Sequence, residues 1–270
     1  MISVTVRKQI RRLQPLVPKS DEGVTILGYH LVGAGTSSSV DLSSAAFVAQ
    51  MRELADFAEV ISLQEAVGWL RGLTEPAPAA GEPRPRVVLT FDDAYANFSE
   101  SVFPVLRDFA FPAVLYVPTD FVDGTSDGPL TGADHLPPCS WAQLGELVDS
   151  GLVTVGSHTC CHRDLRRLSY EDVERELLRS KRTLEERLGV SVESFCYPRA
   201  QWNARTEELV QRHYRTAVVA GGAKAYPRDW RPHRLPRIPI RNDAPVSLSP
   251  VLGQRFWLEE WVADRWRRHA

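Results

Sequence analysis

The sequence has no apolar run that approaches the ~20 residues needed for a membrane-spanning helix. Residues 1–19 are basic but contain neither an uninterrupted apolar h-region nor a small-residue cleavage site, so they do not resemble a signal peptide. An excess of charge of one sign is also absent, because the formal net charge is only −2. Nucleic acid is therefore not expected as a partner.

Cysteine is scarce as well. The chain has four cysteines, far too few for a disulfide scaffold, and the adjacent pair Cys160 and Cys161 is poorly placed for bonding. Together with the missing signal peptide, this usage favours a reducing cytoplasm.

No internal repeat is visible, and we predict one α/β domain preceded by a short segment. Residues 1–22 are charged and turn-prone, and their apolar positions fall at helical spacing. We expect a surface helix packed on the domain, with peripheral membrane association as the alternative. Residues 23–270 form the main domain, because the Pro/Ala/Gly/Glu-rich stretch 74–85 is too short to separate two domains.

Strand and helix patterns alternate along this domain. Apolar, β-favouring runs predict strands over residues 24–29, 60–61, 86–91, 113–117, 152–155, 194–197, 216–219 and 235–240. Helical patterns lie between most of these runs, including residues 98–109 and 169–188. Residues 123–138 lack periodicity and predict a long loop. Such alternation is typical of a parallel α/β sheet.

Two adjacent carboxylates end one of the predicted strands. The apolar run 86–91 stops abruptly at Asp92 and Asp93. In α/β folds the carboxyl ends of the strands carry the chemistry. Because two carboxylates placed there repel each other, they need a cation or a division of roles. A solvated turn is the simpler interpretation of this pair taken alone.

A second polar segment follows another apolar run, residues 152–155. It contains His158 and His162, four residues apart in a predicted strand-end loop. The helical zinc-protease motif does not apply, because Thr159 stands where that motif needs a glutamate. One aspartate and two histidines at strand ends indicate a three-ligand divalent metal site with an open position.

Together these two segments resemble the polysaccharide deacetylases of carbohydrate esterase family 4, the NodB-homology domain. The resemblance is carried by Thr90-Phe91-Asp92-Asp93 and by Ser157-His158-Thr159 followed by His162 and Leu165. It covers residues 24–240 and implies an α/β fold, a distorted (β/α)7 barrel that is TIM-barrel-like. The implied activity is metal-dependent removal of the N-acetyl group from an N-acetylated carbohydrate substrate, with release of acetate.

The resemblance assigns the metal ligands to Asp93, His158 and His162. Two imidazoles and a carboxylate suit Zn²⁺, with Co²⁺, Ni²⁺, Mn²⁺ and Fe²⁺ as alternatives. Asp92 then acts as the general base toward the attacking water. The family has no cysteine ligand in this loop, so Cys160 and Cys161 are expected to serve the loop or its packing.

The departing amine needs a proton, which most of the family supplies from a histidine in a late Leu-x-His motif. The late histidines here, at positions 213, 233 and 269, do not follow that pattern. Gly28-Tyr29-His30 at the end of the first strand instead resembles the permuted branch typified by poly-N-acetylglucosamine deacetylases. The resemblance makes His30 the general acid, and a histidine satisfied in the core is the alternative.

One family motif is altered in this chain. Residues 195–200 keep the proline of an Arg-x-Pro-Tyr-like motif but have Cys196 and Arg199 in place of its arginine and tyrosine. The family's oxyanion contact from this motif is a backbone N–H, which would come from Arg199 here. Arg237 is the nearest motif-like substitute for the missing arginine, which orients the catalytic aspartate in the family.

Two other functions remain candidates. One is deacylation of a different small or lipid-linked amide, because no export signal or binding module is visible. The other is a catalytically inactive, carbohydrate-binding relative. The altered positions Cys196 and Arg199 would permit inactivity, whereas the complete metal-binding set argues against it.

Overall fold

The computed structural model describes residues 23–73, 84–126, 130, 136–221, 224–243 and 246–252. The predictions for residues 1–22, for most of residues 74–85 and for His269 lie outside these ranges. So does part of the predicted loop 123–138. No helix in the described ranges is long and apolar enough to span a membrane.

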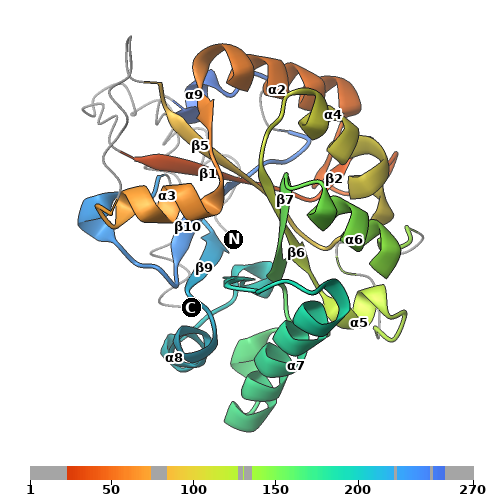
Figure 1. Ribbon diagram of the computed structural model, residues 1–270, viewed down its shortest axis with the longest axis vertical. Helices are drawn as coiled ribbons and strands as arrows, with labels where there is room; N and C mark the ends of the chain where they lie inside the picture. The colour runs from red at the N-terminus through yellow and green to blue at the C-terminus, as the bar shows by residue number, and fades with distance from the viewer. Residues whose placement is uncertain are drawn as a thin grey trace.

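Seven parallel strands close into a barrel (Figure 1), which confirms the predicted distorted (β/α)7 fold. Their order around the barrel is β1-β5-β6-β7-β8-β9-β10, and β10 pairs in turn with β1. The strands are β1 (Val24–Tyr29), β5 (Arg86–Phe91), β6 (Ala113–Val117), β7 (Val153–Ser157), β8 (Ser194–Cys196), β9 (Thr216–Ala220) and β10 (Leu235–Pro239).

Three short strands lie beside the closed barrel. β4 (Glu59–Val60) pairs with the first two residues of β5, and β2 (Leu31–Val32) pairs with β3 (Asp41–Leu42) directly after β1. His30 lies between β1 and β2. All of these pairings are parallel, and the sequence pattern predicted neither β2 nor β3.

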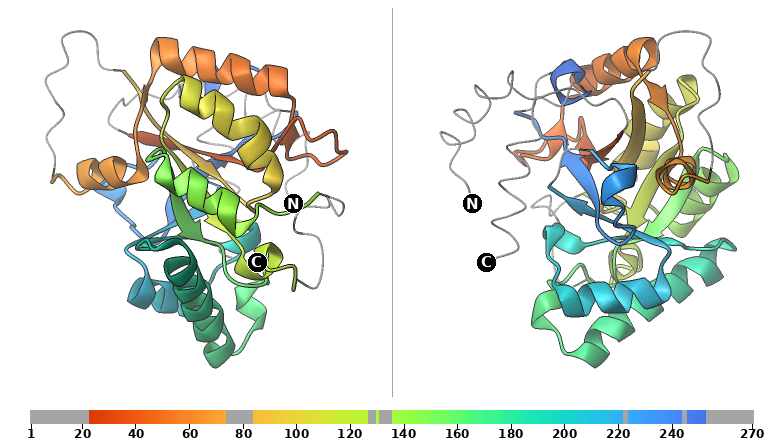
Figure 2. Two further views of the ribbon diagram at one scale, coloured as in Figure 1. Left: turned by 45° about the vertical axis from the view of Figure 1, so that its right-hand side comes forward. Right: turned by 90° about the vertical axis from the view of Figure 1, so that its left-hand side faces the viewer.

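Helices cover the outside of the barrel, with α2 and α4 on one side and α7 and α8 on the other (Figures 1 and 2). The helices are α2 (Ser44–Phe57), α3 (Leu63–Leu70), α4 (Phe103–Asp108), α5 (Thr119–Val122), α6 (Trp141–Asp149), α7 (Tyr170–Leu188), α8 (Ala204–His213) and α9 (Ser249–Leu252). Short 3-10 turns span Leu165–Arg167, Pro198–Ala200 and Pro227–Asp229.

Serine side chains cap the starts of several helices. Ser62 and Ser140 complete capping boxes, and Ser169 accepts the backbone N–H of Asp172 at the start of α7. Gly189 ends α7 in the left-handed conformation, with φ 68°. Local sequence chemistry therefore accounts for these boundaries.

The segment 98–109, predicted as one helix, is divided into a π-helical part and a shorter α-helix. Its first part, Phe98–Val102, is π-helical, and α4 begins only at Phe103. Pro104 lies within the predicted helix and has no N–H to donate to the preceding turn. A π-helical segment is rare and occurs mostly as a single turn within a longer helix, as it does here.

The two faces of β5 pack against different clusters, and this determines the direction in which Asp92 points. Val87, Leu89 and Phe91 belong to the cluster that packs against the outer helices. Val88 belongs to the cluster that also contains Tyr116 of β6, together with residues from β8 and β9. Because strand side chains alternate, the residues at positions 90 and 92 continue the face of Val88. Asp92 thus points into the mouth of the barrel.

Candidate metal centre and acid–base site

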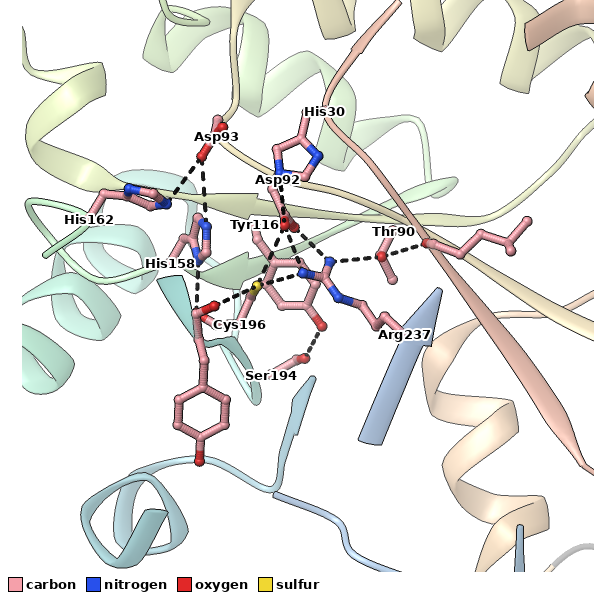
Figure 3. A network of polar contacts seen from close by, with 12 residues as sticks. His30, Thr90, Asp92, Asp93, Tyr116, His158, His162, Ser194, Cys196 and Arg237 are labelled. Atoms are coloured by element: carbon pink, nitrogen blue, oxygen red, sulfur yellow. Dashed lines mark hydrogen bonds and ion pairs between the residues drawn. The ribbon is translucent and has the colours of Figure 1, made fainter. Parts of the chain in front are cut away.

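Asp92 and Asp93 leave β5 in different directions (Figure 3). Asp92 continues the strand, and its N–H donates to the Tyr29 carbonyl at 3.0 Å. Asp93 adopts φ 73°, a left-handed conformation that aspartate tolerates better than most residues. This break in the strand alternation separates two neighbouring carboxylates, so each has its own set of partners.

Asp93 faces both histidines of the second motif. His158 Nε2 lies 3.7 Å and His162 Nε2 lies 3.6 Å from Asp93 Oδ1. The three side chains are buried, and their ligand atoms lie within 4.8 Å of one another. Neither carboxylate oxygen of Asp93 has a hydrogen-bond partner among the described residues. Buried polar atoms without partners are costly, and a divalent cation would satisfy all three groups.

The electrostatics of this cluster fit the same interpretation. Burial raises the pKa of Asp93 well above its usual range, and the charge of Asp92 adds to the shift. Burial also lowers the pKa of His158, and burial with the neighbouring His158 lowers the pKa of His162. Metal binding requires neutral imidazoles, which this environment favours.

The orientation of His158 is set by its second ring nitrogen. Nδ1 donates to the carbonyl of Cys196 at 2.8 Å, which leaves the lone pair of Nε2 directed toward Asp93. Ligating histidines are commonly held by such an outer hydrogen bond. Strand β8 therefore fixes the tautomer of a residue that β7 supplies.

Residues 158–162, here called the ligand loop, turn back sharply after β7. Thr159 and His162 have φ of 68° and 54°. The N–H of His162 donates to Thr159 Oγ1 at 2.9 Å, which stabilises the turn. Strained backbone of this kind is found where the surrounding structure imposes it, often at functional sites.

Asp92 is held by an arginine from β10, the strand that flanks β1 on the side away from β5. Arg237 of β10 donates from Nη1 to Oδ1 and from Nη2 to Oδ2, both at 2.7 Å. Burial alone would raise the pKa of Asp92, but the charge and hydrogen bonds of Arg237 hold it well below its usual range. Asp92 is therefore ionised and fixed in orientation.

The guanidinium of Arg237 is itself enclosed. It donates to Thr90 Oγ1 and to Cys196 Sγ, both at 3.0 Å, and lies 5.6 Å from the ring of Tyr116. Asp92, His158 and Cys196 form a second group with metal-ligand spacing. Because Arg237 contacts both Asp92 and Cys196, a cationic side chain already occupies this group.

His30 approaches Asp92 from the end of β1. Its Nε2 lies 3.6 Å from Asp92 Oδ2, and its side chain remains 21% exposed. Burial lowers the pKa of His30 to about 4, although the charge of Asp92 opposes the shift. His30 is therefore neutral at pH 7.

The other described histidines lie elsewhere. His213 contacts Glu174 at 3.3 Å, and His233 donates from Nε2 to the Tyr214 carbonyl at 3.0 Å. Neither has a contact with Asp92. Among the described candidates for the general acid, which are His30, His213 and His233, only His30 lies beside Asp92.

Arg199 lies in the 3-10 turn after β8, with its side chain exposed and its backbone at φ 54°, ψ 21°. Its charge opposes the rise in the pKa of Asp93 and adds to the lowering of the pKa of His162, so it faces the same mouth. The oxyanion role expected of its N–H stays a prediction.

Sequence reasoning missed the buried polar support beneath the site. Thr90 Oγ1 donates to the Leu27 carbonyl at 2.7 Å while accepting from Arg237, and the hydroxyls of Tyr116 and Ser194 lie 2.7 Å apart. The sequence did offer a signal for Thr90: it is a polar residue two positions before Asp92 and therefore on the same face of the strand.

Comparison with known proteins adds a family to this geometry. The family model described as polysaccharide deacetylase matches residues 79–218. This range includes Asp92, Asp93 and the ligand loop, whereas His30 and Arg237 lie outside it. The chain is 35% identical over 113 residues to the poly-beta-1,6-N-acetyl-D-glucosamine N-deacetylase of Escherichia coli (strain K12), covering 36% of this chain and 17% of that protein.

Two solved structures share the fold. IcaB from Ammonifex degensii superposes with a TM-score of 0.69 at 23% identity, covering 88% of this chain and 97% of that one. The Streptococcus pyogenes deacetylase PplD gives a TM-score of 0.68 at 20% identity, covering 91% and 98%. At these identities the likeness shows the fold alone.

Proposed function

The chain belongs to the polysaccharide deacetylase family, and we propose that it is a metal-dependent hydrolase that removes the N-acetyl group from an N-acetylated amino sugar. The observation that carries the proposal is the division of the carboxylate pair. Asp93 faces two imidazoles, while Asp92 faces Arg237 and His30. A metal-binding half and an acid–base half thus meet at one barrel mouth.

Asp93, His158 and His162 would hold the metal. Two nitrogens and one carboxylate oxygen suit Zn²⁺ first, with Co²⁺, Ni²⁺, Mn²⁺ or Fe²⁺ as alternatives. When bound, such an ion polarises the amide carbonyl and makes water a better nucleophile. The N–H of Arg199 is proposed to donate to the oxyanion that develops on the carbonyl oxygen.

The residues around Asp92 transfer the proton from the attacking water to the departing amine. Hydrolysis adds hydroxyl to the acetyl carbon and a proton to the departing amine. Asp92 accepts the proton of the attacking water, and Arg237 keeps the accepting carboxylate ionised and oriented. A carboxylate with so low a pKa holds that proton weakly. His30, neutral at rest and 3.6 Å away, passes it to the amine nitrogen.

The substrate class follows from the relatives. The proteins that the chain resembles include deacetylases of poly-β-1,6-N-acetyl-D-glucosamine and of chitooligosaccharides. We propose an N-acetylglucosamine-containing oligosaccharide or glycoconjugate. The match spans only 17% of the length of the Escherichia coli relative. Deacylation of another small or lipid-linked amide is the second candidate.

Acetate release tests the proposal directly. Protein reconstituted separately with Zn²⁺, Co²⁺ and Ni²⁺ is incubated with β-1,6- and β-1,4-linked N-acetylglucosamine oligomers and with N-acetylated metabolites. We expect metal-dependent acetate release from at least one glucosamine oligomer. Release only from other amides would favour the second candidate. Sugar binding without release under every metal would indicate an inactive relative.

The role of His30 gives a separate prediction. We expect His30→Ala to lower turnover by ~10²–10⁴-fold, because the amine then departs without a positioned proton donor. His213→Ala is the control, since His213 pairs with Glu174 away from Asp92. Turnover and bound metal are measured for both variants. Near-native turnover of His30→Ala with metal retained would exclude His30 as the proton donor.

A further inference from the structure

Helix α7 contacts the backbone of the ligand loop through Glu176. Glu176 Oε2 accepts the backbone N–H of Cys160 at 2.8 Å and that of Cys161 at 3.1 Å. Both N–H groups lie between the two histidines of the loop. Glu176 is half-buried.

The geometry of the loop explains why a carboxylate fits there. Thr159, in the left-handed conformation, precedes these residues, and successive N–H groups in such a turn converge on one point. Converging N–H groups favour an anion, and hydrogen bonds to a charged acceptor are stronger than neutral ones. The carboxylate of Glu176 thus fixes two of the four peptide planes that separate His158 from His162.

Helix α5 holds the carbonyl groups of the same loop. The N–H of Thr119 donates to the Thr159 carbonyl at 3.3 Å, and the N–H of Asp120 donates to the Cys160 carbonyl at 3.0 Å. Arg179, one turn beyond Glu176 on α7, pairs with the carboxylate of Asp120. The ligand loop therefore lies between two helices that are joined by an ion pair.

The thiols contribute less to this arrangement than the backbone does. Cys161 Sγ donates to Asp120 Oδ2 at 2.8 Å, and Arg179 Nε donates to Cys160 Sγ at 3.1 Å. Neither thiol belongs to a three-residue metal-ligand group within the described ranges. A serine at either position keeps the N–H that Glu176 accepts.

We propose that Glu176 is a positioning residue for the candidate metal centre. Its carboxylate holds the ligand loop in the conformation that presents both imidazoles to Asp93, and so raises the affinity for the metal. The inference rests on the proposed function, in which Asp93, His158 and His162 bind that metal. Without Glu176 the two N–H groups lose their acceptor, and the left-handed turn loses one of its supports.

The test measures metal affinity rather than activity. Metal-free protein is titrated with Co²⁺, and the visible absorption of the bound ion reports both affinity and coordination geometry. We expect Glu176→Ala to weaken binding by ~10–100-fold, the usual effect of losing an outer partner of a ligand. Glu176→Gln keeps a neutral acceptor of the same shape, so its loss should be smaller.

Two controls isolate the role of the carboxylate. Glu186→Gln makes the same chemical change at an exposed position of α7, and Cys160→Ser changes the loop side chain while keeping its N–H. Both should bind Co²⁺ as the unmodified protein does. Thermal unfolding of each metal-free variant establishes that it is folded, and Glu176→Gln carries the comparison if Glu176→Ala does not fold.

The outcomes separate the two proposals. If the unmodified protein bound no metal, both the proposed function and this inference would be overturned. If it bound metal and folded Glu176 variants matched Glu186→Gln, the inference alone would fail. A graded loss, with alanine weaker than glutamine and an altered Co²⁺ spectrum, supports the positioning role.

Discussion

Asp93→Asn is expected to lose metal binding and nearly all deacetylase activity while leaving the metal-free protein at least as stable. Asparagine tolerates the left-handed backbone at φ 73°, so the turn after β5 should survive. The amide oxygen is a much weaker ligand than a carboxylate. The affinity should therefore fall by more than the ~10–100-fold that losing an outer partner causes.

The stability of the metal-free variant provides the second measurement. Asp93 buries two carboxylate oxygens that have no hydrogen-bond partner in the described part of the chain, next to the charge of Asp92. Removing such a group is often neutral or stabilising, because function rather than folding required it. Zinc at ~100 times the dissociation constant should stabilise the unmodified protein by ~2.7 kcal/mol and the variant hardly at all. Equal stabilisation of both by zinc would exclude Asp93 as a ligand.

Asp92→Asn is expected to keep the metal but lower turnover by ~10²–10⁴-fold, because water then loses its proton acceptor. The same substitution leaves the charge of Arg237 buried without its counter-ion. Breaking one side of a buried ion pair typically costs ~3–5 kcal/mol of stability. The variant should therefore be both slower and less stable.

A double variant separates these two effects. Asp92→Asn combined with Arg237→Met removes the unpaired charge while preserving the hydrogen bond from Thr90 to the Leu27 carbonyl. We expect stability to recover substantially and turnover to remain low. Denaturant unfolding and steady-state kinetics on the single and double variants measure the two quantities. Near-native turnover in either variant would rule out Asp92 as the base.

The motifs predicted the three residues that the structure brings together at the candidate metal centre, and their role as ligands stays a prediction. Asp93 follows an apolar run, and His158 and His162 follow another. In a parallel sheet the carboxyl ends of strands lie at one edge, so these residues had to approach each other. Serine and glycine caps likewise fixed the starts and ends of helices, because capping depends on local backbone geometry.

The positions of the residues around Asp92, by contrast, depend on the tertiary structure. The motif resemblance suggested His30 and Arg237, but these lie 62 and 145 positions from Asp92 and belong to strands at the two ends of the chain order. Only the pairing of β1 with both β5 and β10 closes the barrel and brings them together. Closure is a property of the complete sheet, so no local pattern records it.

The sequence by itself determined the α/β alternation, the strand-end motifs and the identities of the chemical groups. The tertiary structure decided which face of each strand turned inward, because strands buried on both sides show no hydrophobic period to distinguish the faces. It therefore decided that Thr90, Asp92, Tyr116 and Arg237 share one interior. It also decided that Glu176, on a helix beyond the motif, holds the ligand loop, since that contact depends on how α7 packs against β7.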